Sequence, residues 1–132
     1  MTERAYSSKT AADTIDGNFV FVYGTLMRGQ SAHAYLAEAE YIGEYRLPGY
    51  AMYDLGWYPG IVPDPARTVY GEVYRVSDQM LWKMDGYEGE GSLYHRVRAN
   101  AENESGTVPV FVYVYARKTG SGLIPGGRWD SR

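Results

Sequence analysis

Runs of apolar residues, and alternation of apolar with polar positions, predict a chain built mainly of short strands. Segment 19–23 (FVFVY) consists of Phe, Val and Tyr only, so we expect a strand that is buried on both faces. Its aromatic side chains face one way and its valines the other, because side chains alternate along a strand. Segments 68–76 (TVYGEVYRV), 94–102 (YHRVRANAE) and 108–118 (VPVFVYVYARK) are also predicted to be strands.

The middle of the chain is predicted to contain two further strands. Segments 41–47 (YIGEYRL) and 49–55 (GYAMYDL) are separated at Pro48-Gly49, a dipeptide typical of turns. The next segment, 56–67, contains three prolines and is predicted to be a loop.

Two short helices are predicted between the strands. Ser31 can cap an alanine-rich helix over 32–40. Ser77-Asp78 supplies an N-cap hydroxyl and an early carboxylate for a second helix over 78–84, which should end near Asp85.

The first and last long strands, 19–23 and 108–118, share a pattern of aromatic residues backed by valines. Two strands with so few polar residues are most easily buried side by side. We therefore expect an α+β fold: a small twisted mixed β-barrel flanked by short helices. The folded domain should span 18–116, between a flexible polar leader (1–17) and a Gly-rich tail (117–132).

Composition narrows the classes of function. The net charge is -3, from 13 basic and 16 acidic residues, so there is no electrostatic basis for binding nucleic acid or an anionic membrane. The absence of cysteine excludes disulfides, thiolate metal sites and a cysteine nucleophile. No stretch approaches the roughly 20 apolar residues of a membrane helix, and the N-terminus lacks a signal-peptide core. We expect a cytoplasmic protein; no particular oligomeric state is indicated.

Neither the histidines nor the Gly-rich segment indicates a catalytic triad, a metal centre or a phosphate-binding loop. His33 and His95 are the only histidines, and two isolated imidazoles do not supply the partners of a triad or metal centre. Packing or surface roles are the more common interpretation. Segment 86–92 (GYEGEGS) is Gly-rich, but lacks the Lys-Ser/Thr and the helix that follow a phosphate loop.

Among the carboxylates, Glu88 stands out by position. It follows the predicted second helix directly and has Tyr87 as its neighbour. An aromatic neighbour can partly desolvate a carboxyl and raise its pKa, as a general base working near neutrality requires. Glu90 and Glu72 are weaker candidates, and Asp85 is typical of a helix end.

The turn Tyr23-Gly24-Thr25-Leu26, hereafter the cradle turn, is the second candidate. Backbone N–H groups at the end of a buried strand can form a concavity that favours an anion. Gly24 permits close approach of the backbone, and Thr25 adds a hydroxyl. A tight turn without a ligand is an equally good interpretation of this turn alone. With Glu88, the turn suits a small zwitterion such as an amino acid.

At these residues the sequence resembles the gamma-glutamylcyclotransferase-like family, and specifically its γ-glutamylamine cyclotransferase branch. The resemblance rests on FVYGTLMRGQ (21–30), YGEVYRVSDQMLWKMDGYEG (70–89) and LYHRV (93–97), in that order. It covers about residues 19–116.

The resemblance implies a function and a site. The cradle turn would hold a glutamyl α-carboxylate through its backbone amides, and Glu88 would be the catalytic acid and base. The implied reaction releases 5-oxoproline from a small-molecule γ-glutamyl amine or peptide, with no metal or cofactor. Tyr94 and Tyr115 are further candidates for substrate binding.

Some positions leave alternatives open. Met27 stands where amine-specific relatives often have a basic residue, so the leaving group is not specified. The loop 54–65 and the tail could both wall a substrate channel. Tyr58 and Tyr115 either line it or pack, and Trp129 either closes it or anchors the tail. The alternative to an enzyme is a non-catalytic module that binds a γ-glutamyl metabolite.

Overall fold

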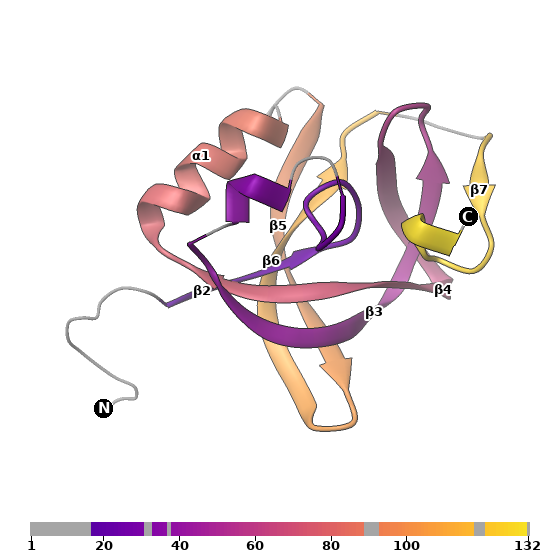
Figure 1. The fold of residues 1–132 in the computed structure, drawn as a ribbon. Coiled ribbons are helices and arrows are strands. Elements are labelled where there is room, and N and C mark those ends of the chain that lie inside the picture. The colour runs from indigo at the N-terminus through magenta and orange to yellow at the C-terminus, as the bar shows by residue number, and fades with distance from the viewer. Residues whose placement is uncertain (1–16, 31–32, 37, 89–92, 118–120, 132) are drawn as a thin grey trace.

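The computed structural model describes residues 17–30, 33–36, 38–88, 93–117 and 121–131. In this part of the chain a strongly bent sheet closes into a mixed β-barrel, with one α-helix against its flank (Figure 1). The predicted α+β barrel is therefore confirmed. Apart from Gly17, the predicted leader lies outside the described residues.

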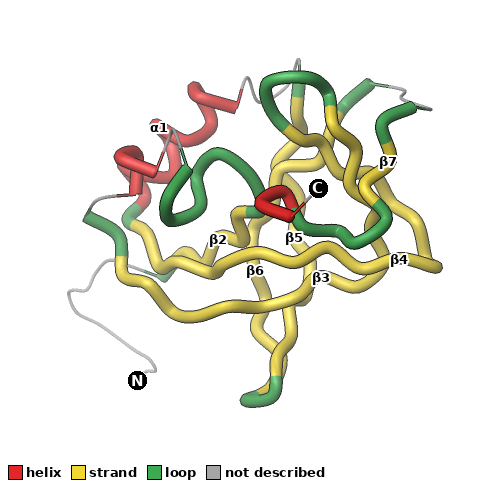
Figure 2. The backbone as a smooth tube through the Cα atoms, turned by 45° about the vertical axis from the view of Figure 1, so that its right-hand side comes forward, coloured by secondary structure: helices red, strands yellow, loops and turns green. Residues whose placement is uncertain are grey.

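The barrel has five strands, as the described residues show, and a short sixth strand extends the sheet. The strands are β2 (Asn18–Val22), β3 (Glu40–Asp54), β4 (Pro59–Val76), β5 (Tyr94–Asn103), β6 (Gly106–Tyr115) and β7 (Leu123–Ile124). Their order is β4-β2-β6-β5-β3-β7, and pairing of β3 with β4 closes the ring (Figure 2). β2 and β6 are neighbours, as the shared pattern of these strands predicted. They run parallel, with Val20 opposite Phe111.

The prediction was wrong about the middle of the chain. β3 runs continuously through Pro48-Gly49, with an irregularity in its register between Pro48 and Tyr50. The predicted loop 56–67 belongs to β4 from Pro59 onward, and Pro63 lies opposite Tyr50. Proline is tolerated in a sheet at bulges and bends, where its missing N–H breaks no regular ladder. These prolines therefore mark where a long ribbon bends.

The helices also differ from the prediction. Residues His33–Leu36 form only a 3-10 turn, η1, and β3 already begins at Glu40. Helix α1 (Asp78–Glu88) begins as predicted, with the Ser77 hydroxyl oxygen accepting the Met80 N–H at 3.1 Å. It continues beyond Asp85, so Glu88 is the last residue of the helix rather than part of a loop.

The C-terminal segment is anchored to the barrel. β7 pairs with β3, and the Gly127 carbonyl accepts the Tyr70 N–H at 2.9 Å. In the short 3-10 helix η2 (Trp129–Ser131), the Trp129 side chain is buried. Of the two interpretations of Trp129, the structure therefore supports the anchor.

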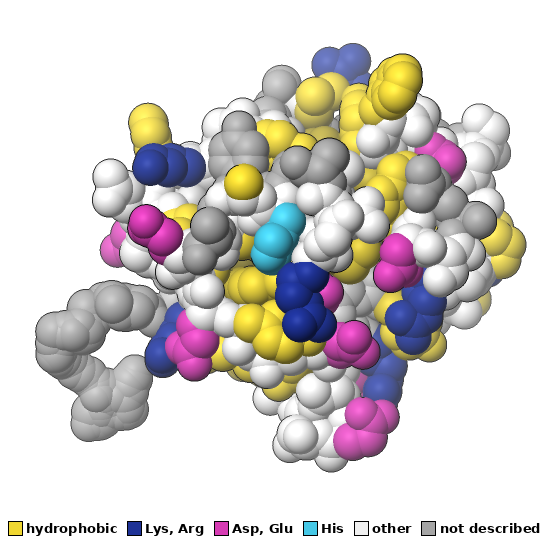
Figure 3. All heavy atoms as spheres, viewed as in Figure 1, with side chains coloured by type: hydrophobic (Ala, Val, Ile, Leu, Met, Phe, Trp, Pro, Cys, Tyr) yellow, Lys and Arg dark blue, Asp and Glu magenta, His cyan; other side chains and the backbone are white. Residues whose placement is uncertain are grey.

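On the face in Figure 3, basic and acidic side chains are interspersed and form no extended basic area. No helix among the described residues has the length and apolar character needed to cross a membrane.

Candidate active site

A cavity of about 360 Å³ lies where the end of β2 meets α1. Six of the seven site residues predicted from the sequence line it; they are Tyr23, Gly24, Thr25, Leu26, Glu88 and Tyr94. Tyr115 is not among the described lining residues, and neither are Trp129 and Glu72. The fold thus brings the cradle turn and the end of α1, more than 60 positions apart in the sequence, to one space.

Glu88 supplies the cavity with a carboxyl that is a weaker acid than usual. The side chain is half-buried at the C-terminal end of α1. Burial disfavours the charged form and raises the pKa of Glu88 to about 7. A carboxyl with this pKa is present in both protonation states near neutrality, so it can accept or donate a proton.

The last turn of α1 is fixed to the barrel through Asp85. Its Oδ1 accepts a hydrogen bond of 2.6 Å from the Tyr113 hydroxyl and forms an ion pair of 3.1 Å with Arg96 Nε. Positions three apart lie on neighbouring parts of a helix surface. The contacts of Asp85 with Arg96 on β5 and Tyr113 on β6 therefore hold the helix turn that carries Glu88.

A second link joins α1 to the cradle turn. The hydroxyl oxygens of Thr25 and Tyr87 lie 2.9 Å apart and share a hydrogen bond. The Thr25 hydroxyl, predicted as a ligand contact, thus already has a partner in the protein.

Gly24 is required for a reason that the sequence did not show. Its φ is not in the left-handed region, but a Cβ at this position would lie 2.5 Å from Cγ of Pro59. The Gly24 carbonyl accepts the Met27 N–H at 3.0 Å, which closes the turn. Tyr23 also lines the cavity. Its hydroxyl donates to the Tyr113 carbonyl at 2.6 Å, so this group already has a partner in the protein.

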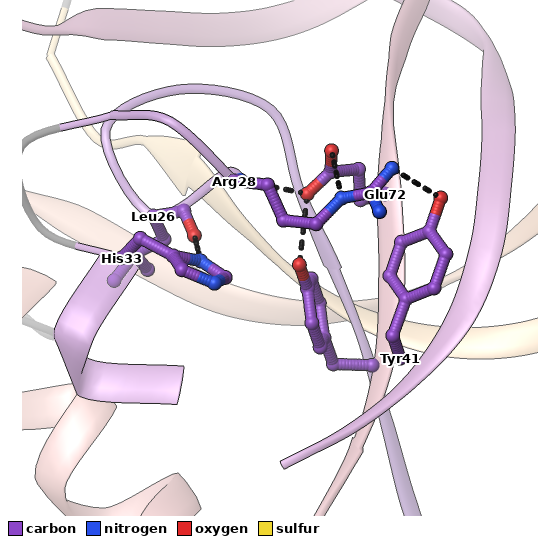
Figure 4. Close-up of polar contacts among 6 residues, drawn as sticks. Leu26, Arg28, His33, Tyr41 and Glu72 are labelled. Carbon is purple, nitrogen blue, oxygen red and sulfur yellow. Dashed lines mark hydrogen bonds and ion pairs between the residues drawn. The ribbon is translucent and has the colours of Figure 1, made fainter. Parts of the chain in front are cut away.

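The loop after the cradle turn is held from behind by Glu72 (Figure 4). This buried carboxylate accepts the Arg28 N–H and the Tyr74 hydroxyl, both at 3.0 Å. The Arg28 guanidinium lies 4.0 Å from the centre of the Tyr41 ring. Glu72, a weaker catalytic candidate from the sequence, therefore lies behind the site and supports it.

His33 also contacts this loop (Figure 4). Its Nδ1 lies 3.0 Å from the Leu26 carbonyl oxygen. Because a carbonyl oxygen only accepts, Nδ1 is the nitrogen that carries the proton. His33 thus has a structural contact, as the packing interpretation expects.

Three further tyrosines lie at or near the cavity: Tyr58 and Tyr94 line it, whereas Tyr115 packs beside it. The Tyr94 hydroxyl donates to the Pro59 carbonyl at 2.7 Å. Its ring centre lies 6.4 Å from that of Tyr58 and 5.7 Å from that of Tyr115. Tyr58 lines the cavity, whereas Tyr115 packs against Gly60, where a Cβ would lie 3.0 Å from the tyrosine.

Trp57 and Leu93 also line the cavity, and the sequence patterns did not predict either residue as part of the site. Trp57 lies in the segment 54–65, which was expected to wall a substrate channel, so the sequence indicated this region but not the residue. His95 is exposed on β5, and Glu90 falls outside the described residues. No three His, Asp or Glu side chains in the described ranges gather as a metal site would require.

Comparisons with a family model, with curated proteins and with solved structures all indicate the same family. The family model described as gamma-glutamyl cyclotransferase, AIG2-like, matches residues 20–131. The chain is 35% identical over 114 residues to the gamma-glutamylcyclotransferase family protein YtfP of Escherichia coli K12, covering 86% of this chain and 96% of YtfP. It is 32% identical over 112 residues to the gamma-glutamylaminecyclotransferase of Bos taurus, covering 76% and 66%. The crystal structure of an AIG2-like protein from Mus musculus superposes with a TM-score of 0.78 at 28% identity, covering 86% and 88%.

Proposed function

The chain belongs to the AIG2-like gamma-glutamyl cyclotransferase family, and on this premise we propose that it releases 5-oxoproline from a γ-glutamyl amine or γ-glutamyl peptide. The observation that carries the proposal is the presence of Glu88, with a pKa raised to about 7, in one cavity with the cradle turn. An anion site beside a carboxyl suited to proton transfer matches a glutamyl group, which has an α-carboxylate and an α-amine.

Substrate binding begins at the cradle turn. Gly24, Thr25 and Leu26 line the cavity, and backbone N–H groups in such a turn attract an anion. The glutamyl α-carboxylate binds there. Pro59 behind Gly24 and Glu72 behind Arg28 hold the turn in place before substrate arrives, so little ordering is left to pay at binding.

Glu88 then moves one proton. Its carboxylate takes a proton from the α-ammonium of the substrate, and the free amine attacks the γ-carbonyl carbon. The new C–N bond closes a five-membered ring, while the bond from that carbon to the leaving amine breaks. The proton on Glu88 passes to the departing nitrogen, which restores the carboxylate. The ring nitrogen then loses its second proton, and the free amine takes up a proton to become an ammonium, which balances the reaction.

The intramolecular attack requires no nucleophile from the protein, in keeping with the absence of cysteine. Holding the glutamyl chain folded back lowers the barrier by roughly 7 kcal/mol or more, as for other well-oriented intramolecular reactions. The amine type of leaving group, favoured over a peptide by the resemblance, is part of this proposal.

The test is release of 5-oxoproline, measured by mass spectrometry, from γ-glutamyl amines, γ-glutamyl dipeptides and glutathione. We expect product from at least one compound and a loss of at least about 100-fold in Glu88→Gln, the scale for removing a general base. Glu104→Gln is the matched control, because Glu104 is exposed and does not line the cavity. Turnover by Glu88→Gln at the wild-type rate would reject the role of Glu88. Binding without any product would favour a non-catalytic module.

A further inference from the structure

The part of the cavity wall that the cradle turn and Glu88 do not form is aromatic and aliphatic. Trp57 and Tyr58 contribute from the turn before β4, Tyr87 from α1, and Leu93 from the residue before β5. Within the described lining, Glu88 has the only carboxyl, and no ammonium, guanidinium or imidazole group is present. The described part of this wall therefore offers no group of opposite charge to a carboxylate.

The exposure of two of these residues points to a ligand. Trp57 is 90% exposed and Tyr87 40% exposed. Only four large hydrophobic side chains are exposed in the described part of the chain, and these two line the same cavity. Exposed aromatic side chains at the edge of a pocket are typical of a surface that an apolar ligand covers.

The proposed reaction fixes which part of the substrate meets this wall. With the α-carboxylate in the cradle turn and the γ-carbonyl beside Glu88, the amide substituent extends toward the remaining lining. That substituent leaves as the free amine. Its chemistry is therefore matched to Trp57, Tyr58, Tyr87 and Leu93.

We propose that the preferred leaving group is an apolar amine, aromatic or large aliphatic, with no further charged group. This inference rests on the proposed function and names its substrate class. Amides whose leaving group is an amino acid or peptide carry a carboxylate. Beside this wall the carboxylate has no charged partner among the described lining residues, and the hydration that it loses where it contacts the apolar side chains is not replaced, which is unfavourable.

A matched pair of substrates tests the inference. γ-Glutamyl-phenethylamine and γ-glutamyl-phenylalanine differ only in the carboxylate of the leaving group. We expect kcat/KM for 5-oxoproline release to be at least about tenfold higher for the phenethylamine compound. A charged group in an apolar pocket discriminates at least as strongly as one methylene, which alone accounts for about 10-fold or more.

Variants test whether Trp57 causes the preference for an apolar leaving group. Trp57→Ala is expected to lower kcat/KM for γ-glutamyl-phenethylamine about tenfold more than for γ-glutamyl-methylamine, whose leaving group is too small to cover Trp57. Trp82→Ala is the matched control, because Trp82 is 74% exposed on α1 but does not line the cavity. It should leave the ratio of the two substrates unchanged.

The outcomes separate this inference from the proposed function. Equal or better turnover of γ-glutamyl-phenylalanine, or an equal effect of Trp57→Ala on both amines, would overturn the inference while leaving the cyclotransferase intact. Absence of product from every compound would reject the proposed function instead. Calorimetric binding of the matched pair to Glu88→Gln then decides the inference without turnover, with tighter binding of the phenethylamine compound expected and equal affinity contradicting it.

Discussion

The hydroxyl oxygens of Thr25 and Tyr87 lie 2.9 Å apart, and this contact joins the cradle turn to the last turn of α1. The two residues are 62 positions apart in the sequence. One hydrogen bond thus connects the proposed carboxylate site to the helix that ends at Glu88.

Loss of this contact should impair activity more than stability. Tyr87→Phe removes the hydroxyl from a partly exposed bond, so the free energy of unfolding should fall by about 1 kcal/mol or less. We expect KM for a γ-glutamyl amine to rise several-fold, because the cradle turn and Glu88 are no longer held at a fixed separation. Steady-state kinetics of Thr25→Val, Tyr87→Phe and the double variant measure the coupling. Fully additive effects would show that the contact does not position the site.

The pH dependence of stability should show the raised pKa of Glu88. The pKa is about 7 in the folded protein against an ordinary 4.5, so between these values the folded state retains a proton that the unfolded chain has lost. The free energy of unfolding should therefore fall as pH rises from about 4.5 to about 7. Urea denaturation at several pH values tests this, and Glu88→Gln should remove that part of the slope. An unchanged slope in the variant would contradict the assignment.

The pH dependence of turnover should have the opposite sign. The reaction begins with the Glu88 carboxylate, so kcat/KM should rise through about pH 7 as this group ionises in the free enzyme. A profile of kcat/KM for one good substrate between pH 5 and 9 provides the measurement, with the ionisation of the substrate α-amine determined separately. A rate that is flat across neutrality would argue against Glu88 as the base.

Glu72 should matter for both stability and substrate binding. Glu72→Ala leaves the Arg28 N–H and the Tyr74 hydroxyl without their acceptor, which should lower the free energy of unfolding by about 1–3 kcal/mol. KM should also rise, since the loop after the cradle turn loses its anchor. Glu102→Ala, which breaks a half-exposed pair with Arg46, is the control and should cost only about 0–1 kcal/mol. Equal effects of the two variants would refute the special role of Glu72.

Two Gly→Ala substitutions should act in opposite directions. At Gly24 the added methyl meets Pro59, so we expect a loss of about 1–3 kcal/mol from overpacking and a displaced cradle turn. Gly86 lies in α1 with open space where its Cβ would be, so alanine should add about 0.5–1 kcal/mol of stability. Thermal and urea denaturation measure both changes. A Gly24→Ala protein as stable and active as the wild type would disprove the contact.

Patterns within short segments were sufficient to predict much of the fold. The apolar strands 19–23 and 108–118 had to be buried, and they are neighbours in the barrel. Ser77 marked the start of α1 correctly, because an N-cap acts on N–H groups only a few residues away. The same local reasoning failed at Pro48 and over 56–67, because the bend and register of a long ribbon depend on the strand beside it.

The sequence by itself determined the position of most strands and the start of α1, and its resemblance to a family predicted roles for Glu88 and the cradle turn. Only the tertiary structure decided what surrounds them: the pKa of Glu88 near 7, the anchor at Asp85, the support from Glu72 and the exposed Trp57 at the cavity. Acidity and exposure depend on which distant residues exclude water from a group, and closure of the barrel is what brings those residues together.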